Sequence, residues 1–144
     1  MSSHPKVIRD RSAMLAGMTP TLQEQRFVFC TTQDPAIAAT LIGRCVTFFR
    51  EKEGHSFVLL EDIATEQGFE TSLPMACIVL EVFSALDGVG LTAGVAASLA
   101  EANIPCNMIA AYHHDYVFVP EKLKHEAMRV LRDLQSCEAG KLDA

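Results

Sequence analysis

The order of the elements predicted for the second half of the chain limits its fold more than any other feature. The stretch 76–84, ACIVLEVFS, is rich in β-branched and aromatic residues and has one uniformly apolar face, which predicts a strand. A helix is expected over 90–102, where Leu91, Val95 and Leu99 recur every fourth residue before a stop signal. The chain therefore passes from a strand through a short loop into a helix of mostly small residues.

Two short strands and a second helix follow. The stretches CNMIAAY (106–112) and YVFV (116–119) predict a β-hairpin. PEKLKHEAMRVLRDLQ (120–135) has an apolar stripe and predicts an amphipathic helix, whereas the polar tail 136–144 predicts a frayed end. The resulting order, β-α-β-β-α, is a ferredoxin-like unit that lacks its last strand.

The first half repeats this order after an amphipathic turn, DRSAMLAGM, that predicts a leading helix. Strands are expected at 26–32, 45–51 and 56–62, and helices at 34–43 and 62–68. We infer a duplication, in which strand 76–84 closes the first unit while it opens the second. The expected fold class is α+β, a ferredoxin-like tandem of β-α-β-β-α units (1–70 with a leading helix, and 71–144) that share a mixed sheet with helices on one face.

Length, charge and hydropathy exclude several classes of protein. The chain has 144 residues, 49% of them apolar, which is enough for a continuous core. Its net charge of −6 and its 12 unclustered basic residues argue against nucleic acid as a partner. No apolar run approaches the roughly 20 residues that span a bilayer, and the first residues lack the apolar middle of a secretory signal. We expect a cytoplasmic protein that binds no membrane.

The cysteines and one strand carboxylate have simple interpretations. The five cysteines are an odd set without a CxxC pair, and reduced, structural thiols are expected. Glu81 interrupts an apolar strand, so it either reaches water or is paired. The strand face that also bears Val79 and Phe83 is too apolar to be left in water, which favours self-association.

The stretch His113-His114-Asp115 lies between the two strands of the predicted hairpin. Adjacent strand residues point to opposite faces, so only a turn would let both histidines converge on one metal ion. A zinc site would need further ligands, and the chain has no HxxxH or HExxH pair. The alternatives are a turn in which Asp115 accepts hydrogen bonds from backbone amides, a polar contact to a ligand or partner repeat, and a metal or acid–base site.

The loop LDGVGL, residues 86–91, joins the first strand of the second repeat to its helix. Two glycines allow another group to approach the backbone, and the helix start presents unpaired amides that favour a carboxylate. The loop is not a GxGxxG phosphate motif because residue 93 is alanine. The alternative is a tight turn in which Asp87 caps the helix.

The second repeat resembles the ACT domain, an amino-acid-sensing module of many biosynthetic enzymes. Asp87, Gly90 and Leu91 form the pattern Asp-x-x-Gly-Leu, and the stretch from Ile78 to Pro120 is similar to bacterial stand-alone tandem ACT-like proteins. The resemblance implies a dimer that binds an amino acid between the loop of one unit and the second strand of its neighbour. The residues implied are Asp87, Gly88, Val89, Gly90 and Leu91 in the loop, and Asn107, Met108 and Ile109 on the strand.

The resulting hypothesis is a non-enzymatic, amino-acid-binding regulatory protein that forms a homodimer or higher homo-oligomer and needs no cofactor or metal. One alternative is a protein–protein interaction scaffold without a ligand. Another is a small metal-dependent enzyme built on His113, His114 and Asp115.

Overall fold

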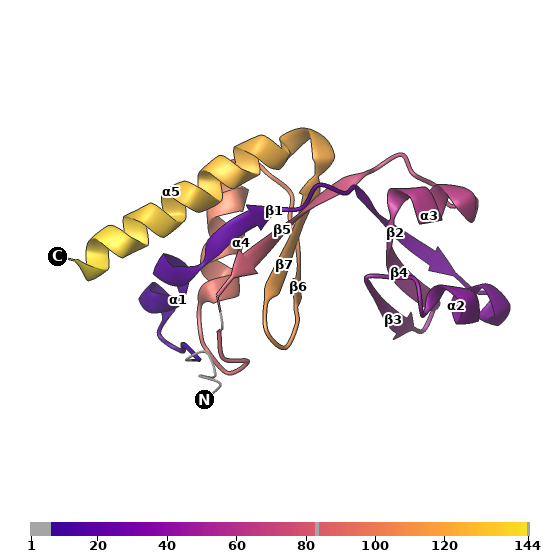
Figure 1. The fold of residues 1–144 in the computed structure, drawn as a ribbon, viewed down its shortest axis with the longest axis horizontal. Coiled ribbons are helices and arrows are strands. Elements are labelled where there is room, and N and C mark those ends of the chain that lie inside the picture. The colour runs from indigo at the N-terminus through magenta and orange to yellow at the C-terminus, as the bar shows by residue number, and fades with distance from the viewer. Residues whose placement is uncertain (1–6, 83, 144) are drawn as a thin grey trace, which may run out of the picture. The chain divides into compact units, whose positions relative to one another are not determined.

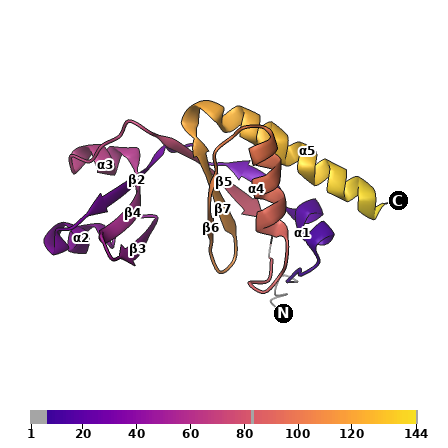
Figure 2. The same cartoon turned by 180° about the vertical axis from the view of Figure 1, so that it is seen from behind.

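The structure is a computed structural model that describes residues 7–82 and 84–143. It divides into two compact units. The inserted unit is Glu24–Ala76, and the discontinuous unit combines Met1–Gln23 with Cys77–Ala144. Figure 1 and Figure 2 show the elements of each unit from two sides.

The inserted unit is a small antiparallel sheet covered by two helices. Strand β2 (Phe27–Thr32) pairs with β4 (Gly54–Leu60), which pairs with β3 (Thr47–Glu51). Helices α2 (Pro35–Leu41) and α3 (Glu61–Glu66) contribute to one core with the strands. That core consists of buried Val28, Ala38, Leu41, Phe57, Leu59 and Ala64. Alternating strand positions supply its sheet side, as the period of two requires.

The discontinuous unit has a sheet in the order β1-β5-β7-β6 and three helices that contact one another. The elements are α1 (Arg11–Gly17), β1 (Thr19–Leu22), β5 (Met75–Glu81), α4 (Leu91–Glu101), β6 (Asn107–Ala110), β7 (Asp115–Pro120), the 3-10 turn η1 (Glu121–Leu123) and α5 (Lys124–Leu142). Strand β1 is antiparallel to β5, and β6 is antiparallel to β7. Buried Leu15, Ile78, Leu99, Phe118 and Leu131 show that α1, β5, α4, β7 and α5 all contribute to the core.

The missing last strand of each repeat is supplied by another part of the chain. In the inserted unit, the start of β5 takes the fourth position beside β2 through the pair Phe27 and Met75, which confirms the role predicted for the strand at 76–84. In the discontinuous unit, the fourth position beside β5 belongs to β1, whose Thr19 lies opposite Glu81. The sequence analysis did not predict β1, because TPTL is too short and contains a proline.

The boundaries of the compact units follow Gln23 and Ala76, whereas the predicted boundary between the repeats lies at residue 70. Helix α1 and strand β1 precede the first repeat in sequence but pack with the second, because the apolar side of α1 lies against α5 and α4. Met14 and Leu15 are fully buried there. Capping fixes where α1 begins, since the Asp10 carboxylate accepts a hydrogen bond of 2.9 Å from the Ala13 amide.

The structure also tests the predictions made for the C-terminal tail, for Val79 and for Glu81. The tail predicted to fray is helical to Leu142, because α1 packs along α5 and the side-chain Nε2 of Gln135 donates to the Ala16 carbonyl at 3.1 Å. Val79 is buried, so it contributes no exposed apolar face, and Phe83 lies outside the described residues. Glu81 is exposed, as one of its two interpretations required.

The described cysteines are all free thiols, and Cys77 is the buried one. Burial raises the pKa of the Cys77 thiol to about 12 and that of Cys30 to about 11. These thiols therefore stay protonated at neutral pH and pack as small apolar side chains, in agreement with their predicted structural role.

Candidate functional site

The loop between β5 and α4 ends at a glycine that begins the helix. Gly90 is the N-cap of α4 with φ +106°, in the left-handed region, and it provides no side chain to cap the helix. Its carbonyl accepts a hydrogen bond of 2.9 Å from the Gly94 amide. The amides of the first turn of α4 are thus left without a side-chain cap, and their partial positive charge favours an anion.

The tight turn of the alternative interpretation is present, since the Gly88 amide donates to the Ala85 carbonyl at 3.0 Å. The predicted cap is wrong, because Asp87 does not cap α4. Its carboxylate pairs with Arg9 instead, with Oδ1 3.2 Å from Nε, and both side chains are exposed. The neighbouring Val89 is 81% exposed, whereas Leu91, the first residue of α4, is buried. One side of the loop faces solvent and the other faces the core.

The core side of the loop is filled by α1. A Cβ atom at Gly88 would lie 3.0 Å from the Met14 sulfur, and one at Gly90 would lie 2.6 Å from Cδ of Arg11. These glycines therefore allow α1 to approach the backbone closely, a packing role that the sequence interpretation did not include. A ligand at this loop has to approach from solvent, where Val89 and half of the Arg11 side chain are exposed.

The second part of the predicted site lies on β6. Asn107 is exposed and Met108 and Ile109 are half-buried, each paired with a residue of β7. Because β7 lies between β5 and β6, the start of the loop and β6 are about two strand spacings, or roughly 10 Å, apart. The loop and β6 of this unit are therefore not neighbours in the sheet. A site formed by the loop and a β6 strand therefore requires the β6 strand of another copy of the chain.

The predicted hairpin around His113 and His114 is confirmed. The Ala111 amide donates to the His114 carbonyl at 3.0 Å, and Ala110 and Asp115 form the last strand pair. The rings of Tyr112 and His113 meet edge to face at 4.9 Å, beside an open hollow of about 430 Å³ at the hairpin tip.

Burial raises the pKa of Asp115, and the charge of His114 partly opposes this shift. Among residues 7–82 and 84–143, no group of three or more His, Cys, Asp or Glu side chains is arranged to hold a metal ion.

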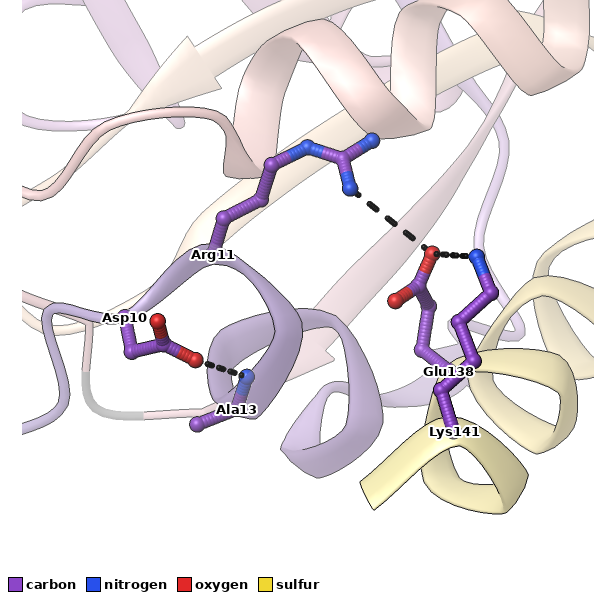
Figure 3. Close-up of polar contacts among 5 residues, drawn as sticks. All are labelled: Asp10, Arg11, Ala13, Glu138 and Lys141. Carbon is purple, nitrogen blue, oxygen red and sulfur yellow. Dashed lines mark hydrogen bonds and ion pairs between the residues drawn. The ribbon is translucent and has the colours of Figure 1, made fainter. Parts of the chain in front are cut away.

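A charged cluster of Arg11, Glu138 and Lys141 lies beside the start of α4 and was not predicted from the sequence. Glu138 of α5 has a side chain only 4% exposed, and its Oε1 lies 3.7 Å from Nη1 of Arg11 and 3.1 Å from Nζ of Lys141 (Figure 3). Its other oxygen, Oε2, is buried without a hydrogen-bond partner. One signal was available, because Glu138 follows Leu131 by seven residues and so continues the apolar stripe of this helix.

Comparison with known proteins identifies the class. A sequence model of the ACT domain matches residues 72–133, and a second ACT-domain model matches residues 7–76. The chain belongs to the ACT-domain family and contains two such domains in tandem. No curated protein sequence matches it.

Solved structures extend this result. A Vibrio cholerae protein of unknown function, described as a possible transport protein, is 34% identical, with a TM-score of 0.76 over 86% of this chain and 94% of that one. An Agrobacterium tumefaciens protein is 16% identical, with a TM-score of 0.64 over 82% and 89% of the two chains. The ligand-free regulatory subunit of aspartate kinase from Thermus thermophilus shares the fold at 12% identity, with a TM-score of 0.61 over 82% and 97%.

The part of the chain that the structure describes contains no helix that is long and apolar enough to cross a membrane.

Proposed function

We propose that this chain is a non-enzymatic regulatory protein that binds an amino acid at the start of α4. The observation that carries the proposal is the tandem of ACT domains, a fold shared with the regulatory subunit of an aspartate kinase. The ligand carboxylate binds the amides that follow Gly90, within the loop Asp87 to Leu91. Residues Asn107, Met108 and Ile109 of a neighbouring copy complete the site.

The local charges support a carboxylate at this position. The first turn of α4 has no side-chain cap, and the half-exposed guanidinium of Arg11 lies beside Gly90. Helix amides and a guanidinium both attract a carboxylate, and the guanidinium forms the stronger, charge-assisted bond. The hairpin residues His113, His114 and Asp115 are further candidates for polar contacts to the ligand or to a partner copy.

Self-association belongs to the same proposal. The loop and β6 are separated by β7 within one unit, so a homodimer or higher oligomer would bring a loop to a neighbouring β6 edge. Ligand binding would favour one arrangement through its higher affinity for that arrangement. We place the protein in the cytoplasm and propose no cofactor.

Isothermal titration with the twenty amino acids tests the binding. At least one is expected to bind below millimolar concentration, and Gly90→Asp should abolish this binding, because its side chain takes the place of the ligand carboxylate at the helix amides and its Cβ displaces Arg11. Gly90→Ala is the matched control for the contact with Arg11, because it adds the same Cβ without a carboxylate, and it should bind more tightly than Gly90→Asp. Gly68→Asp controls for the added charge, since Gly68 also has positive φ (+78°) next to a helix. Absence of binding by all twenty amino acids would overturn the proposal.

A protein-interaction scaffold without a ligand is the second candidate, because Leu86 and Val89 expose apolar side chains on the same loop. Affinity capture that is unchanged by added amino acids, and lost when both residues are replaced by serine, would favour it.

A further inference from the structure

We propose that Arg11 and Glu138 recognise the two charges of the ligand, which enters between them as a zwitterion. Arg11 binds its carboxylate together with the first amides of α4, and Glu138 binds its ammonium group. This inference rests on the proposed function and names the two side chains that recognise the charged groups of the amino acid.

The guanidinium of Arg11 lies over the first turn of α4. Its Nε is 3.2 Å from the position of a Cβ at Gly90, and its Nη2 is 3.3 Å from that of a Cβ at Gly94. Both glycines therefore leave room for this side chain, which is 50% exposed on its other side. A carboxylate at the uncapped amides meets a second, fully charged donor in the same place.

Glu138 lies on the other side of this guanidinium and lacks a partner for one oxygen. Arg11 and Lys141 both approach Oε1, whereas Oε2 is buried without a hydrogen bond (Figure 3). A buried carboxylate oxygen without a donor is unfavourable. The 3.7 Å between Glu138 and Arg11 also exceeds the range of an N–H···O bond. An ammonium group has three donors and satisfies this oxygen.

Entry of a zwitterion between the two side chains conserves every charge pair. Arg11 exchanges the carboxylate of Glu138 for that of the ligand, and Glu138 exchanges a guanidinium for an ammonium group. A 2-oxo acid would leave Oε2 of Glu138 without a donor, since Lys141 reaches only Oε1, and an amine without a carboxylate would leave Arg11 unpaired. Both partial ligands therefore bind more weakly than the amino acid.

The test compares the amino acid found by titration with its 2-oxo acid and its decarboxylated amine. Glu138→Gln is expected to weaken binding of the amino acid at least about tenfold and to remove its preference over the 2-oxo acid. Arg11→Met keeps the aliphatic stem beside Gly90 and should remove the preference over the amine. Glu121→Gln and Arg44→Met, which remove other ion pairs at 2.5 and 2.9 Å, should bind like the wild type.

A purely structural role for the pair predicts a different result. Glu138→Gln and Arg11→Met would then lower the melting temperature without ligand but leave both preferences unchanged, and the inference would fail while the proposed function stands. If one variant does not fold, the other decides. If no amino acid binds the wild type, the proposed function and this inference fail together.

Discussion

The discontinuous unit combines the start of the chain with its second half, and this arrangement can be tested at one residue, Leu15. Leu15 lies near the start of the chain, yet it is fully buried in the unit formed largely by residues 77–144. Its Cδ1 approaches α4 so closely that a Cβ at Gly94 would lie 3.0 Å away. Leu15→Ala removes the side-chain atoms that fill this contact and leaves a cavity between α1 and α4.

The expected loss follows from measured costs of such cavities. A buried Leu→Ala change destabilises a protein by about 2–5 kcal/mol. For a unit of this size, 1 kcal/mol corresponds to roughly 4–8 °C in melting temperature, so a fall of at least about 8 °C is expected. A loss of 2 kcal/mol would accelerate the slowest amide exchange by about thirtyfold.

Hydrogen exchange followed by mass spectrometry locates the effect. Peptides from α4, β7 and α5 should lose protection in Leu15→Ala. Leu41→Ala is the matched control, because Leu41 is equally buried in the core of the inserted unit, and its peptides from β2 and β4 should lose protection. If Leu15→Ala accelerates exchange only before residue 24 and leaves residues 77–142 as protected as in the wild type, the assignment of α1 to that unit is refuted.

Three further predictions concern single groups. Asp10→Ala removes the cap of α1 and should lower the free energy of unfolding by about 1 kcal/mol in urea titration, and an unchanged value would contradict the capping role. Iodoacetamide at pH 8 should alkylate exposed Cys137 long before Cys77, whose pKa is raised to about 12 by burial, and equal rates in peptide mapping would refute this burial. Burial raises the folded-state pKa of Asp115 above its unfolded-state pKa. The contribution of Asp115 to stability therefore declines as the pH rises from the unfolded-state pKa to the folded-state pKa. Asp115→Asn should remove this decline and raise the melting temperature at pH 7, whereas a lower melting temperature would show that the charged carboxylate stabilises the fold.

The candidate site was predictable only where it depends on local sequence. The glycine corner before α4 could be located because Gly90 and the following apolar period mark a helix start. Neither the contact of Met14 with Gly88 nor that of Arg11 with Gly90 leaves a local signal, since more than 70 residues separate the partners. The tail that contains Glu138 has a polar composition, and packing against α1 makes it helical and buries Glu138.

The sequence by itself determined the order of strands and helices, apart from β1, and the ACT-type duplication. Apolar periodicity, caps such as Asp34 and the turn at Gly54 act over a few residues, so they can be recognised without knowledge of the rest of the chain.

Only the tertiary structure decided which segment completes each unit. A four-residue strand such as β1 has little stability alone and forms because β5 offers it an edge. For the same reason α1 belongs to the later repeat, since its buried face depends on surfaces that α4 and α5 supply much later in the chain.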